Sequence, residues 1–402
     1  MIGISKLYCG TITPGDVLRY GRESAKSPAD LLRFTADKKP VVVWNISRTC
    51  NLKCIHCYSD SDNKRYLGEL SEEEGRKLID DLAEFRAPVL LFSGGEPLMH
   101  PSLFKLVGLA SSKGLRAVVS TNGTLLTTEA VGRLKDAGVS YVGISIDGLE
   151  ETNDSFRGKK GAFRASLEGI RTCTGLGVKA GLRLTLTKRN LNDLEGIFEL
   201  VETEDIPRVC FYHLVYSGRG GRLRDEDISH EETRRAMDMI MDWAMSCHRR
   251  GLEKDILTVD NHSDGIYLYL RMLREGRADA EQVRELLLWN GGNSSGVGIA
   301  CIDNLGNVHA DQFWQDYTFG NVRERAFGDI WTDTSDPIMA KLKDRKRFFK
   351  GKCARCRWID MCNGNFRARA IAVYGDPWME DPACYLTHEE IAAEPAETQP
   401  QQ

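Results

Sequence analysis

From residue 40 onward, short apolar segments alternate with longer segments whose apolar residues recur at helical spacing. The apolar segments predict strands over 41–46, 88–92, 115–120, 141–146, 181–187 and 208–215. The segments between them predict helices, the first opening with the capping-box pattern Ser71–Glu74 and the others near 102–113, 127–137, 161–176, 191–203 and 230–250. Six strand–helix units in a row predict an α/β fold with a buried parallel sheet. Right-handed crossovers curl such a sheet into a full or partial barrel, here over 40–250.

The segments outside this alternation have other patterns. Residues 1–39 hold short apolar pieces, such as 7–10 and 31–34, which predict a segment packed on the barrel. The charged stretch 251–295 predicts a helical linker, and 299–309 predicts a β-hairpin with its turn at 304–307. We expect a cysteine-rich C-terminal unit over 296–388. The last residues, 389–402, are dominated by Glu, Ala, Pro and Gln and predict a disordered tail.

Composition narrows the class of protein. The 402 residues are 42% hydrophobic and carry a net charge of −4, which gives no general attraction for nucleic acid. No apolar run is long enough to cross a membrane, and the first residues lack the pattern of a secretory signal. We therefore expect a cytoplasmic protein with neither a nucleic-acid nor a membrane partner. In that reducing compartment, the 12 cysteines are expected to be thiols, and clustered thiols indicate metal ligands.

The first cysteine cluster directly follows the first predicted strand. Cys50, Cys54 and Cys57 have the spacing C-x3-C-x2-C. Three thiolates from one tight loop can hold three irons of a 4Fe–4S cluster and leave the fourth iron open for another ligand. The alternatives are a zinc site, which would need a fourth ligand, or a disulfide with a spare thiol. The spacing favours the cluster.

Polar and glycine-rich residues follow the other predicted strands. These stretches are Ser93–Pro97, Ser120–Gly123, Ser145–Gly148, Arg183 with Thr185, and Tyr212–Gly220. Each alone is typical of a turn. Because the carboxyl ends of parallel strands lie on one face of a barrel, all of them are expected beside the three cysteines.

A second cysteine cluster lies near the C-terminus. Cys353, Cys356, Cys362 and Cys384 could hold a tetrahedral zinc ion or a fully ligated 4Fe–4S cluster. The first cysteine cluster favours iron–sulfur here as well. The five scattered cysteines, Cys9, Cys173, Cys210, Cys247 and Cys301, are expected to be buried apolar residues.

The combination of C-x3-C-x2-C after the first strand with Gly94-Gly95-Glu96-Pro97 after the second resembles the radical S-adenosylmethionine (SAM) superfamily. This resemblance implies a partial (β/α)6 TIM-like barrel, and it implies that the open iron binds the amino and carboxylate groups of SAM. One electron from the reduced cluster would then cleave SAM into methionine and a 5′-deoxyadenosyl radical. A low-potential donor of the flavodoxin or ferredoxin type is the implied electron source.

The resemblance also implies roles for individual residues. Cys50, Cys54 and Cys57 would hold the cluster, and His56 would lie beside the adenine, where the family usually has an aromatic residue. The methionine amine would be bound by Gly94, Gly95 and Glu96. The implied contacts to the ribose and the carboxylate are Ser120, Asn122, Ser145 and Arg183.

The second cysteine cluster resembles the SPASM extension, which carries auxiliary clusters. Cys353, Cys356, Cys362 and Cys384 match the ligands of its outer cluster. The inner cluster lacks its ligands, because Phe366 and Asp311 stand where cysteines are expected and only Cys301 remains. We therefore expect one auxiliary 4Fe–4S cluster, two clusters in total, and a core thiol or weak ligand at Cys301.

Residues 4–10, 212–220 and 375–386 resemble the radical enzymes that trim tetrapyrrole side chains. The N-terminal stretch most resembles those that remove two acetates from 12,18-didecarboxysiroheme to give iron-coproporphyrin in heme biosynthesis. Related enzymes remove propionates on the heme d1 route or decarboxylate propionates to vinyl groups as heme synthases. The remaining alternatives are a peptide-modifying radical SAM/SPASM enzyme and a non-catalytic iron–sulfur carrier.

A substrate with several carboxylates would need cations at the mouth of the barrel. Arg219 and Arg222 are candidates, although both could be solvated loop charges. His213, His262 and His309 are candidate ligands for a substrate iron, although a single histidine is more often a packing residue. The residues alone name no catalytic acid.

Overall fold

The computed structural model describes residues 1–12 and 39–392. A ten-stranded sheet forms its centre, in the order β1-β8-β7-β6-β5-β4-β3-β2-β9-β10. The six predicted strands are all present, as β2 (Val41–Ser47), β3 (Val89–Gly94), β4 (Arg116–Thr121), β5 (Tyr141–Ser145), β6 (Ala180–Leu186) and β7 (Arg208–His213). Neighbouring members of this set pair in parallel. The predicted partial barrel is confirmed, and β1 and β10 are its open edges.

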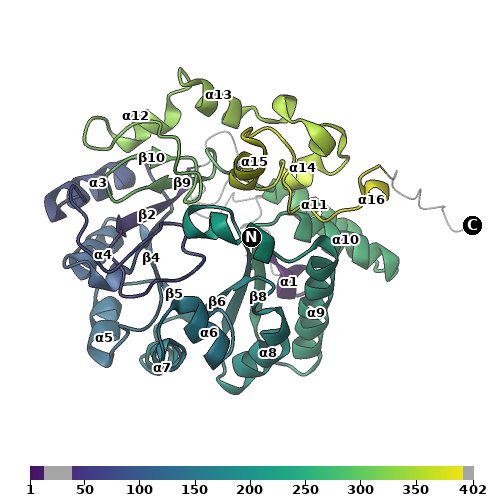
Figure 1. Cartoon of the computed structure of the whole chain (residues 1–402), viewed down its shortest axis with the longest axis horizontal. Helices are drawn as coiled ribbons and strands as arrows, with labels where there is room; N and C mark the ends of the chain where they lie inside the picture. The colour runs from purple at the N-terminus through teal and green to yellow at the C-terminus, as the bar shows by residue number, and fades with distance from the viewer. Residues whose placement is uncertain (13–38, 393–402) are drawn as a thin grey trace, which may run out of the picture.

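Helices cover the outside of the curved sheet (Figure 1). They are α3 (Glu72–Glu84), α4 (Leu103–Ser112), α5 (Thr128–Asp136), α6 (Glu150–Arg157), α7 (Ala162–Gly175), α8 (Leu194–Thr203) and α9 (His230–Arg249). The predicted capping box forms at the start of α3, where the Ser71 hydroxyl accepts from the Glu74 amide and the Glu74 carboxylate accepts from the Ser71 amide. Helix α6 was not predicted, because its eight residues include only one apolar side chain, Phe156.

Large apolar side chains fill the space between the sheet and the helices. Trp44 of β2 and Phe92 of β3 are fully buried, with their ring centroids 5.7 Å apart. Helix α3 packs closely over them at Gly75, where an added Cβ would lie 2.7 Å from the Trp44 ring. Burying each aromatic side chain stabilises the fold by roughly 2–3 kcal/mol.

The segment 251–295 is not helical throughout, which corrects the predicted helical linker. It begins with β8 (Asp255–Val259), which pairs in parallel with β7, and continues with α10 (Ser263–Arg274) and α11 (Ala280–Asn290). Strand β8 escaped prediction because its apolar run is short and follows charged residues. At its other side β8 pairs with β1 (Ile2–Gly3), which leads into α1 (Ile4–Leu7). The start of the chain thus packs on the barrel.

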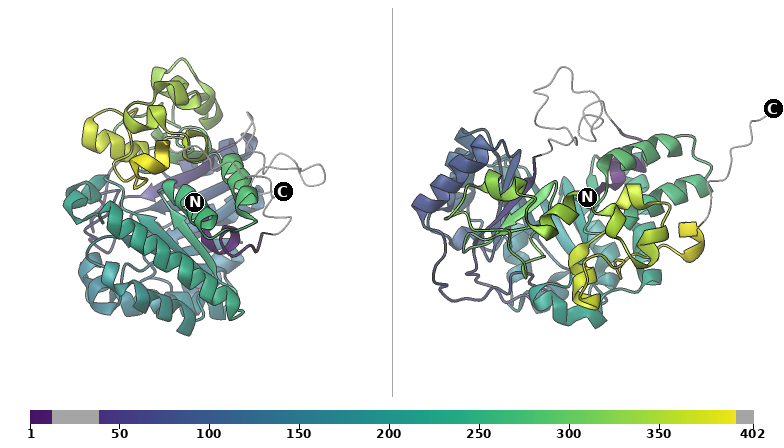
Figure 2. Two further views of the ribbon diagram at one scale, coloured as in Figure 1. Left: turned by 90° about the vertical axis from the view of Figure 1, so that its right-hand side faces the viewer. Right: turned by 90° about the horizontal axis from the view of Figure 1, so that it is seen from above.

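The C-terminal part continues the same sheet. The predicted hairpin is confirmed as β9 (Ile299–Ile302) and β10 (Val308–His309), and β9 pairs in parallel with β2. Short helices follow, namely α12 (Phe327–Thr332), α13 (Pro337–Lys343), α14 (Ile359–Cys362), α15 (Arg367–Tyr374) and α16 (His388–Ala392). Figures 1 and 2 show these C-terminal elements gathered at one side of the barrel.

The first residues of the predicted disordered tail, 389–392, are ordered. They belong to α16, because Glu390 forms an ion pair with Arg234 at 2.7 Å and its carbonyl accepts from the Trp358 indole at 2.9 Å. Residues 393–402 lie outside the described residues, as does the apolar piece 31–34. Within the described ranges, no helix has both the length and the apolarity to cross a membrane.

Candidate active site

A cavity of about 200 Å³ opens at the carboxyl ends of the parallel strands. Its lining brings together most of the residues predicted from the sequence, although they come from six different strand ends or loops. They are Cys50, Cys54, His56, Cys57, Gly94, Gly95, Ser120, Asn122, Ser145, Arg183 and His213. This is the edge of a barrel at which catalytic residues gather.

Two glycines bring the end of β3 against the cysteine loop. A Cβ added at Gly94, whose φ is +115°, would lie 2.3 Å from the Ser47 carbonyl oxygen, and one at Gly95 would lie 2.2 Å from the Thr49 carbonyl oxygen. The Gly95 amide donates to the Ser47 carbonyl at 2.7 Å, which this close approach permits. Glycine is therefore required at both positions, and it fixes where the loop carrying Cys50 begins.

Each of the three thiols receives hydrogen bonds from the protein. The Leu52 amide donates to the Cys50 sulfur at 3.5 Å, and the Ser61 amide donates to the Cys57 sulfur at 3.4 Å. Burial raises the pKa of Cys50 to about 12 and also raises the pKa of Cys54. Metal binding must therefore displace protons from these thiols, after which the donors stabilise the thiolates.

A buried arginine completes the surroundings of the third thiol. Arg157, at the end of α6, donates from Nη1 to the Cys54 sulfur at 3.5 Å and forms an ion pair with Asp147. His56 Nε2 also lies 3.3 Å from the Asp147 carboxylate, and its ring packs on Phe156 with centroids 5.0 Å apart. Burial lowers the pKa of His56 to about 4, so its imidazole is neutral at pH 7.

Glu96 and Asn122 brace the cavity from behind. The Glu96 carboxylate is fully buried, does not line the cavity, and accepts from the Thr121 hydroxyl at 2.7 Å and the Asn122 amide at 2.8 Å. The Asn122 side chain lines the cavity and donates to the Asn51 side chain at 2.8 Å. The two residues thus join the ends of β3 and β4 to the cysteine loop.

Arg183 provides a positive charge in the cavity. It donates from Nη1 to the Ser120 hydroxyl at 2.6 Å, and no carboxylate among the described residues lies within ion-pair distance of it. An added Cβ at Gly143 would lie 2.2 Å from Nε of Arg183, so glycine there makes room for the guanidinium. Ser145, opposite Arg183 in the β5–β6 register, lines the same wall. This wall is suited to bind a carboxylate.

The far wall of the cavity comes from β7 and the loop after β8. His213 and Asp260 line it, and His213 Nε2 lies 2.9 Å from the fully buried Asp264 carboxylate. The other oxygen of Asp264 accepts from the Tyr385 hydroxyl at 2.8 Å. Burial raises the pKa of Asp260 to about 7.

The second cysteine cluster is also brought together. Burial raises the pKa of Cys362 well above its usual range, and the neighbouring thiols Cys353, Cys384 and Cys356 raise it further. The fully buried Arg367 interacts electrostatically with Cys353 and Cys362, and its Nη2 has no hydrogen-bond partner. A buried cation with an unused donor fits a negatively charged group held by these thiols.

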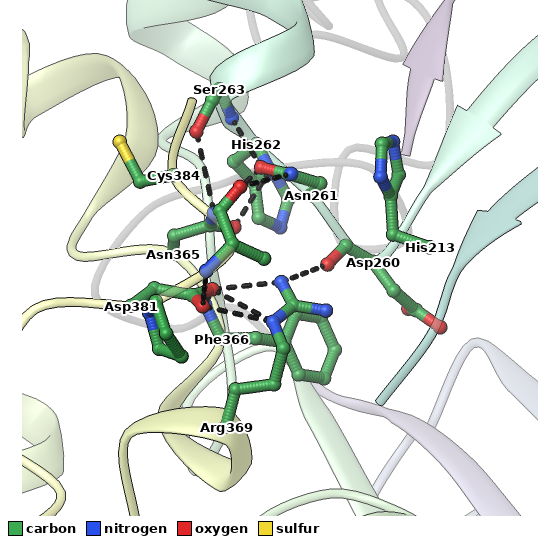
Figure 3. A network of polar contacts seen from close by, with 12 residues as sticks. His213, Asp260, Asn261, His262, Ser263, Asn365, Phe366, Arg369, Asp381 and Cys384 are labelled. Carbon is green, nitrogen blue, oxygen red and sulfur yellow. Dashed lines mark hydrogen bonds and ion pairs between the residues drawn. The ribbon is translucent and has the colours of Figure 1, made fainter. Parts of the chain in front are cut away.

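A buried ion pair ties this second site to the cavity wall (Figure 3). Arg369 and Asp381 are both fully buried and lie 2.7 Å apart. Arg369 also donates to the Leu214 carbonyl at 3.0 Å and the Asp260 carbonyl at 2.6 Å. Because Asp381 lies three residues before Cys384, the loop that carries this cysteine is fixed to the ends of β7 and β8.

The other candidate residues lie elsewhere. Arg219 holds the cysteine loop by donating to the Cys54 carbonyl at 2.7 Å and the Asp60 carboxylate at 3.0 Å, and Arg222 is exposed. His309 is buried against the Tyr317 carbonyl, and His262 does not line the cavity. The scattered cysteines are buried, and the Cys301 sulfur accepts from Asn45 at 3.5 Å.

Comparison with known proteins agrees with this geometry. The Radical SAM superfamily model matches residues 44–201. Fe-coproporphyrin III synthase of Methanosarcina barkeri is 58% identical over 394 residues, 97% of this chain and 99% of that protein. The chain belongs to the radical SAM superfamily. Pre-heme d1 synthase of Dinoroseobacter shibae is 43% identical, with 87% of each chain covered, and the AdoMet-dependent heme synthase of M. barkeri is 33% identical, with 86% and 95% covered.

Solved structures support the fold of this radical SAM enzyme. SuiB of Streptococcus suis bound to its precursor peptide superposes with a TM-score of 0.70, at 17% identity, over 87% of this chain and 76% of that one. Radical SAM enzymes use a 4Fe–4S cluster and SAM, and the residues present fit both. Three thiols with donors aimed at them suit the cluster, and the unpaired Arg183 suits the SAM carboxylate.

The arrangement of the cysteines can be compared with that of a zinc site. In the described part of the chain, no group of three or more His, Cys, Asp or Glu side chains closes around a single metal ion. Thiols around a 4Fe–4S cluster stand further apart than ligands that share one ion. The thiols of Cys353, Cys356, Cys362 and Cys384 lie close enough to influence one another electrostatically.

Sequence reasoning missed several residues of this radical SAM site. Arg157 is 103 positions from its partner Cys54, and Asp264 is 51 positions from His213. Neither stands in a short motif, and α6, which carries Arg157, lacks apolar periodicity. Asp260 was also missed, because its φ of +66°, which is unusual for a residue other than glycine and is common at functional sites, is visible only in the structure.

Proposed function

We propose that this enzyme removes the two acetate side chains of 12,18-didecarboxysiroheme and so forms iron-coproporphyrin III in heme biosynthesis. The observation that carries the proposal is the 58% identity to Fe-coproporphyrin III synthase, which extends over 97% of this chain and 99% of that protein. The aligned length covers the cavity as well as the barrel. The substrate is then an iron tetrapyrrole with several carboxylate groups.

Cys50, Cys54 and Cys57 are the proposed ligands of the catalytic 4Fe–4S cluster. They leave one iron open, and the cluster together with SAM supplies a 5′-deoxyadenosyl radical when both are bound. The protein's part is to hold the thiolates and exclude water. Hydrogen bonds from the Leu52 and Ser61 amides and from Arg157 support the three sulfurs. Cys50 and Cys54 are also buried.

The cavity geometry supports binding of different parts of SAM by different predicted contact residues. Arg183, Ser120 and Ser145 form a wall with a free positive charge, which suits a carboxylate and hydroxyl groups. The carbonyls of Gly94 and Gly95 would accept from an ammonium group, and the Gly94 carbonyl already accepts from the Ser59 hydroxyl at 3.2 Å. The neutral His56 fits beside an adenine.

Glu96 and Asn122 take a supporting role in this proposal. The Glu96 carboxylate accepts from Thr121 and from the Asn122 and Leu98 amides, so its oxygens are already engaged. The Asn122 side-chain amide donates its hydrogen bond to Asn51 in the cysteine loop. Both residues therefore position the loop rather than contact SAM through their side chains.

Cys353, Cys356, Cys362 and Cys384 are the proposed ligands of one auxiliary 4Fe–4S cluster, in a unit of residues 296–388. Its sulfurs and the buried cation Arg367 would stabilise each other. Electrons would come from a low-potential donor of the flavodoxin or ferredoxin type, since each SAM cleavage consumes one electron.

Apolar side chains keep the reacting part of the cavity dry. Val43, Leu91, Leu214, Val215 and Phe313 line the cavity among its polar groups. Water exclusion also strengthens the charge interactions of Arg183.

The test is anaerobic incubation of the reconstituted enzyme with SAM, a low-potential reductant and one tetrapyrrole at a time. About eight irons per chain are expected, four for each cluster. With 12,18-didecarboxysiroheme, the product mass should show loss of two acetate groups. Loss of propionates would instead indicate a pre-heme d1 synthase-like activity, and decarboxylation of iron-coproporphyrin III would indicate a heme synthase. Conversion of no tetrapyrrole would overturn the proposal and favour a peptide substrate.

A further inference from the structure

Two histidines, His56 and His213, line the cavity, and they differ in the surroundings of Nδ1. His213 lies at the end of β7 with Nε2 2.9 Å from the Asp264 carboxylate, and its Nδ1 has no hydrogen-bond partner among the described residues. The Nδ1 of His56 is completely buried without a partner, and its Nε2 faces Asp147, which Arg157 already neutralises. His213 is therefore the cavity histidine with a nitrogen free to bind a ligand.

We infer that His213 is the protein ligand to the iron of the tetrapyrrole substrate. This inference rests on the proposed function, since it requires an iron tetrapyrrole in the cavity. His213 would attach the substrate iron to the cavity wall that is formed by the ends of β7 and β8. There it would fix the distance between the macrocycle and the radical.

The tautomer of His213 follows from its partner. A carboxylate can only accept a hydrogen bond, so the Nε2 of His213 carries the proton that is donated to Asp264. The Nδ1 lone pair is then free. A histidine that donates one N–H to a buried carboxylate and presents the other nitrogen is the usual arrangement of a metal-ligating histidine, because the carboxylate orients the ring and raises its basicity.

The partner of His213 is itself held in place. Asp264 is fully buried in the first turn of α10, and its second oxygen accepts from the Tyr385 hydroxyl at 2.8 Å. Tyr385 follows Cys384 directly in the chain. The carbonyl of Leu214, next to His213, accepts from Arg369. The second cysteine site thus positions the His213–Asp264 pair on the cavity side.

The chain contains a matched histidine for comparison. His309 is as buried as His213 and lies 3.4 Å from the Asp303 carboxylate, but its Nδ1 bonds to the Tyr317 carbonyl at 2.7 Å and it does not line the cavity. Both of its nitrogens face protein groups. His309→Ala is therefore a control for removing a buried His–Asp pair without removing a ligand.

The test uses the reconstituted full chain with ferrous iron-coproporphyrin III as the probe and resonance Raman spectroscopy as the readout. The wild-type complex should show an iron–imidazole stretching band. His213→Ala should lose this band and bind the iron compound at least tenfold more weakly, while its affinity for metal-free coproporphyrin III stays unchanged. Added imidazole should restore the band.

Two further variants sharpen the result. Asp264→Asn should keep the band but move it to lower frequency, because a neutral amide gives the imidazole less anionic character than a carboxylate does. His309→Ala should match the wild type. A wild-type band that persists in His213→Ala would overturn the inference, as would an equal loss of affinity for the iron and the metal-free compounds. Binding of metal-free coproporphyrin III shows whether His213→Ala is folded. If His213→Ala is misfolded, His213→Gln takes its place, and it should lose the iron–imidazole band as well.

The inference and the proposed function fail in different ways. An enzyme that forms iron-coproporphyrin III while His213→Ala keeps the wild-type Raman band refutes the ligand alone. A wild-type enzyme that neither binds nor converts any of the tetrapyrroles refutes the function and the ligand together.

Discussion

Arg157 Nη1 lies 3.5 Å from the sulfur of Cys54, and the arginine side chain is almost completely buried. The Asp147 carboxylate fixes the guanidinium from the other side. A buried cation that donates to a cluster thiolate favours the reduced, more negative state of the cluster. The end of α6 therefore tunes the electron affinity of the proposed catalytic cluster.

Replacing Arg157 by methionine should move the reduction potential of the SAM-binding cluster to a more negative value, by roughly tens of millivolts, where 59 mV corresponds to a tenfold change for one electron. Methionine keeps the apolar volume but removes the charge and the donor. Redox titration followed by EPR measures the shift. Arg164→Met, which removes an exposed arginine on α7, is the control and should leave the potential unchanged. An equal potential in the wild type and in Arg157→Met would contradict this role.

Gly95→Ala should disrupt the cysteine loop. The added Cβ would lie 2.2 Å from the Thr49 carbonyl oxygen and 2.9 Å from the backbone of Arg48, neither of which can move aside independently of the loop. We expect a loss of about 1–3 kcal/mol in stability and a lower iron content after reconstitution, close to the four irons of the other cluster.

Gly132→Ala is the matched control for Gly95→Ala. Gly132 lies inside α5 with open space around its Cα, so alanine should stabilise the helix by up to about 1 kcal/mol. Chemical denaturation and iron analysis of both variants measure the two effects. Full iron content in Gly95→Ala would show that the close approach is not needed for cluster binding.

Removing one partner of the Arg369–Asp381 pair should be strongly destabilising. Arg369→Met leaves the Asp381 carboxylate buried without its cation and frees the carbonyls of Leu214 and Asp260, which should cost roughly 3–5 kcal/mol. Denaturant unfolding measures the loss. Lys346→Ala breaks an ion pair with Asp360 that is more than half exposed and should cost less than about 1 kcal/mol. Similar losses in the free energy of unfolding for Arg369→Met and Lys346→Ala would contradict the bracing role of Arg369.

Asp260 should make the stability depend on pH. Burial raises its pKa to about 7, with Arg369 and His213 opposing this shift and Asp311 adding to it. Between about pH 4 and pH 7 the carboxyl ionises in the unfolded chain but stays protonated in the folded one. The free energy of unfolding should therefore fall as the pH rises through this range.

Asp260→Asn removes this contribution. Relative to the variant, the wild type should lose on the order of a few kcal/mol of stability between pH 4.5 and pH 7.5, since one pKa unit corresponds to about 1.4 kcal/mol. Denaturant unfolding of both proteins at the two pH values gives the comparison. Parallel pH profiles would mean that the Asp260 carboxyl ionises normally in the folded protein.

The barrel was predictable because its signals are local. Apolar strands and capping boxes such as Ser71–Glu74 depend on residues a few positions apart. The same holds for the three thiols and for the strand ends, because parallel strands place their carboxyl ends together whatever the helices between them contain. These rules sufficed to gather most of the candidate cavity residues.

The rest of the site depends on contacts that have no local signal. Glu96 stands in a recognisable motif, yet only the fold shows that its carboxylate turns away from the cavity to brace Thr121 and Asn122. Strand β8 contains only a short apolar run, and its place in the sheet follows from pairing with β7 and β1. The role of Asp264 could not be predicted, because its contact with His213 forms only when α10 packs beside the end of β7.

The most direct test of the account is the ratio of products in one anaerobic reaction with SAM, reductant and 12,18-didecarboxysiroheme. We predict one 5′-deoxyadenosine for each acetate removed, with iron-coproporphyrin III as the final tetrapyrrole, and neither product from Cys57→Ala. Cleavage of SAM without any change in the tetrapyrrole would contradict the proposed substrate. Conversion of the tetrapyrrole by Cys57→Ala would contradict the proposed cluster itself.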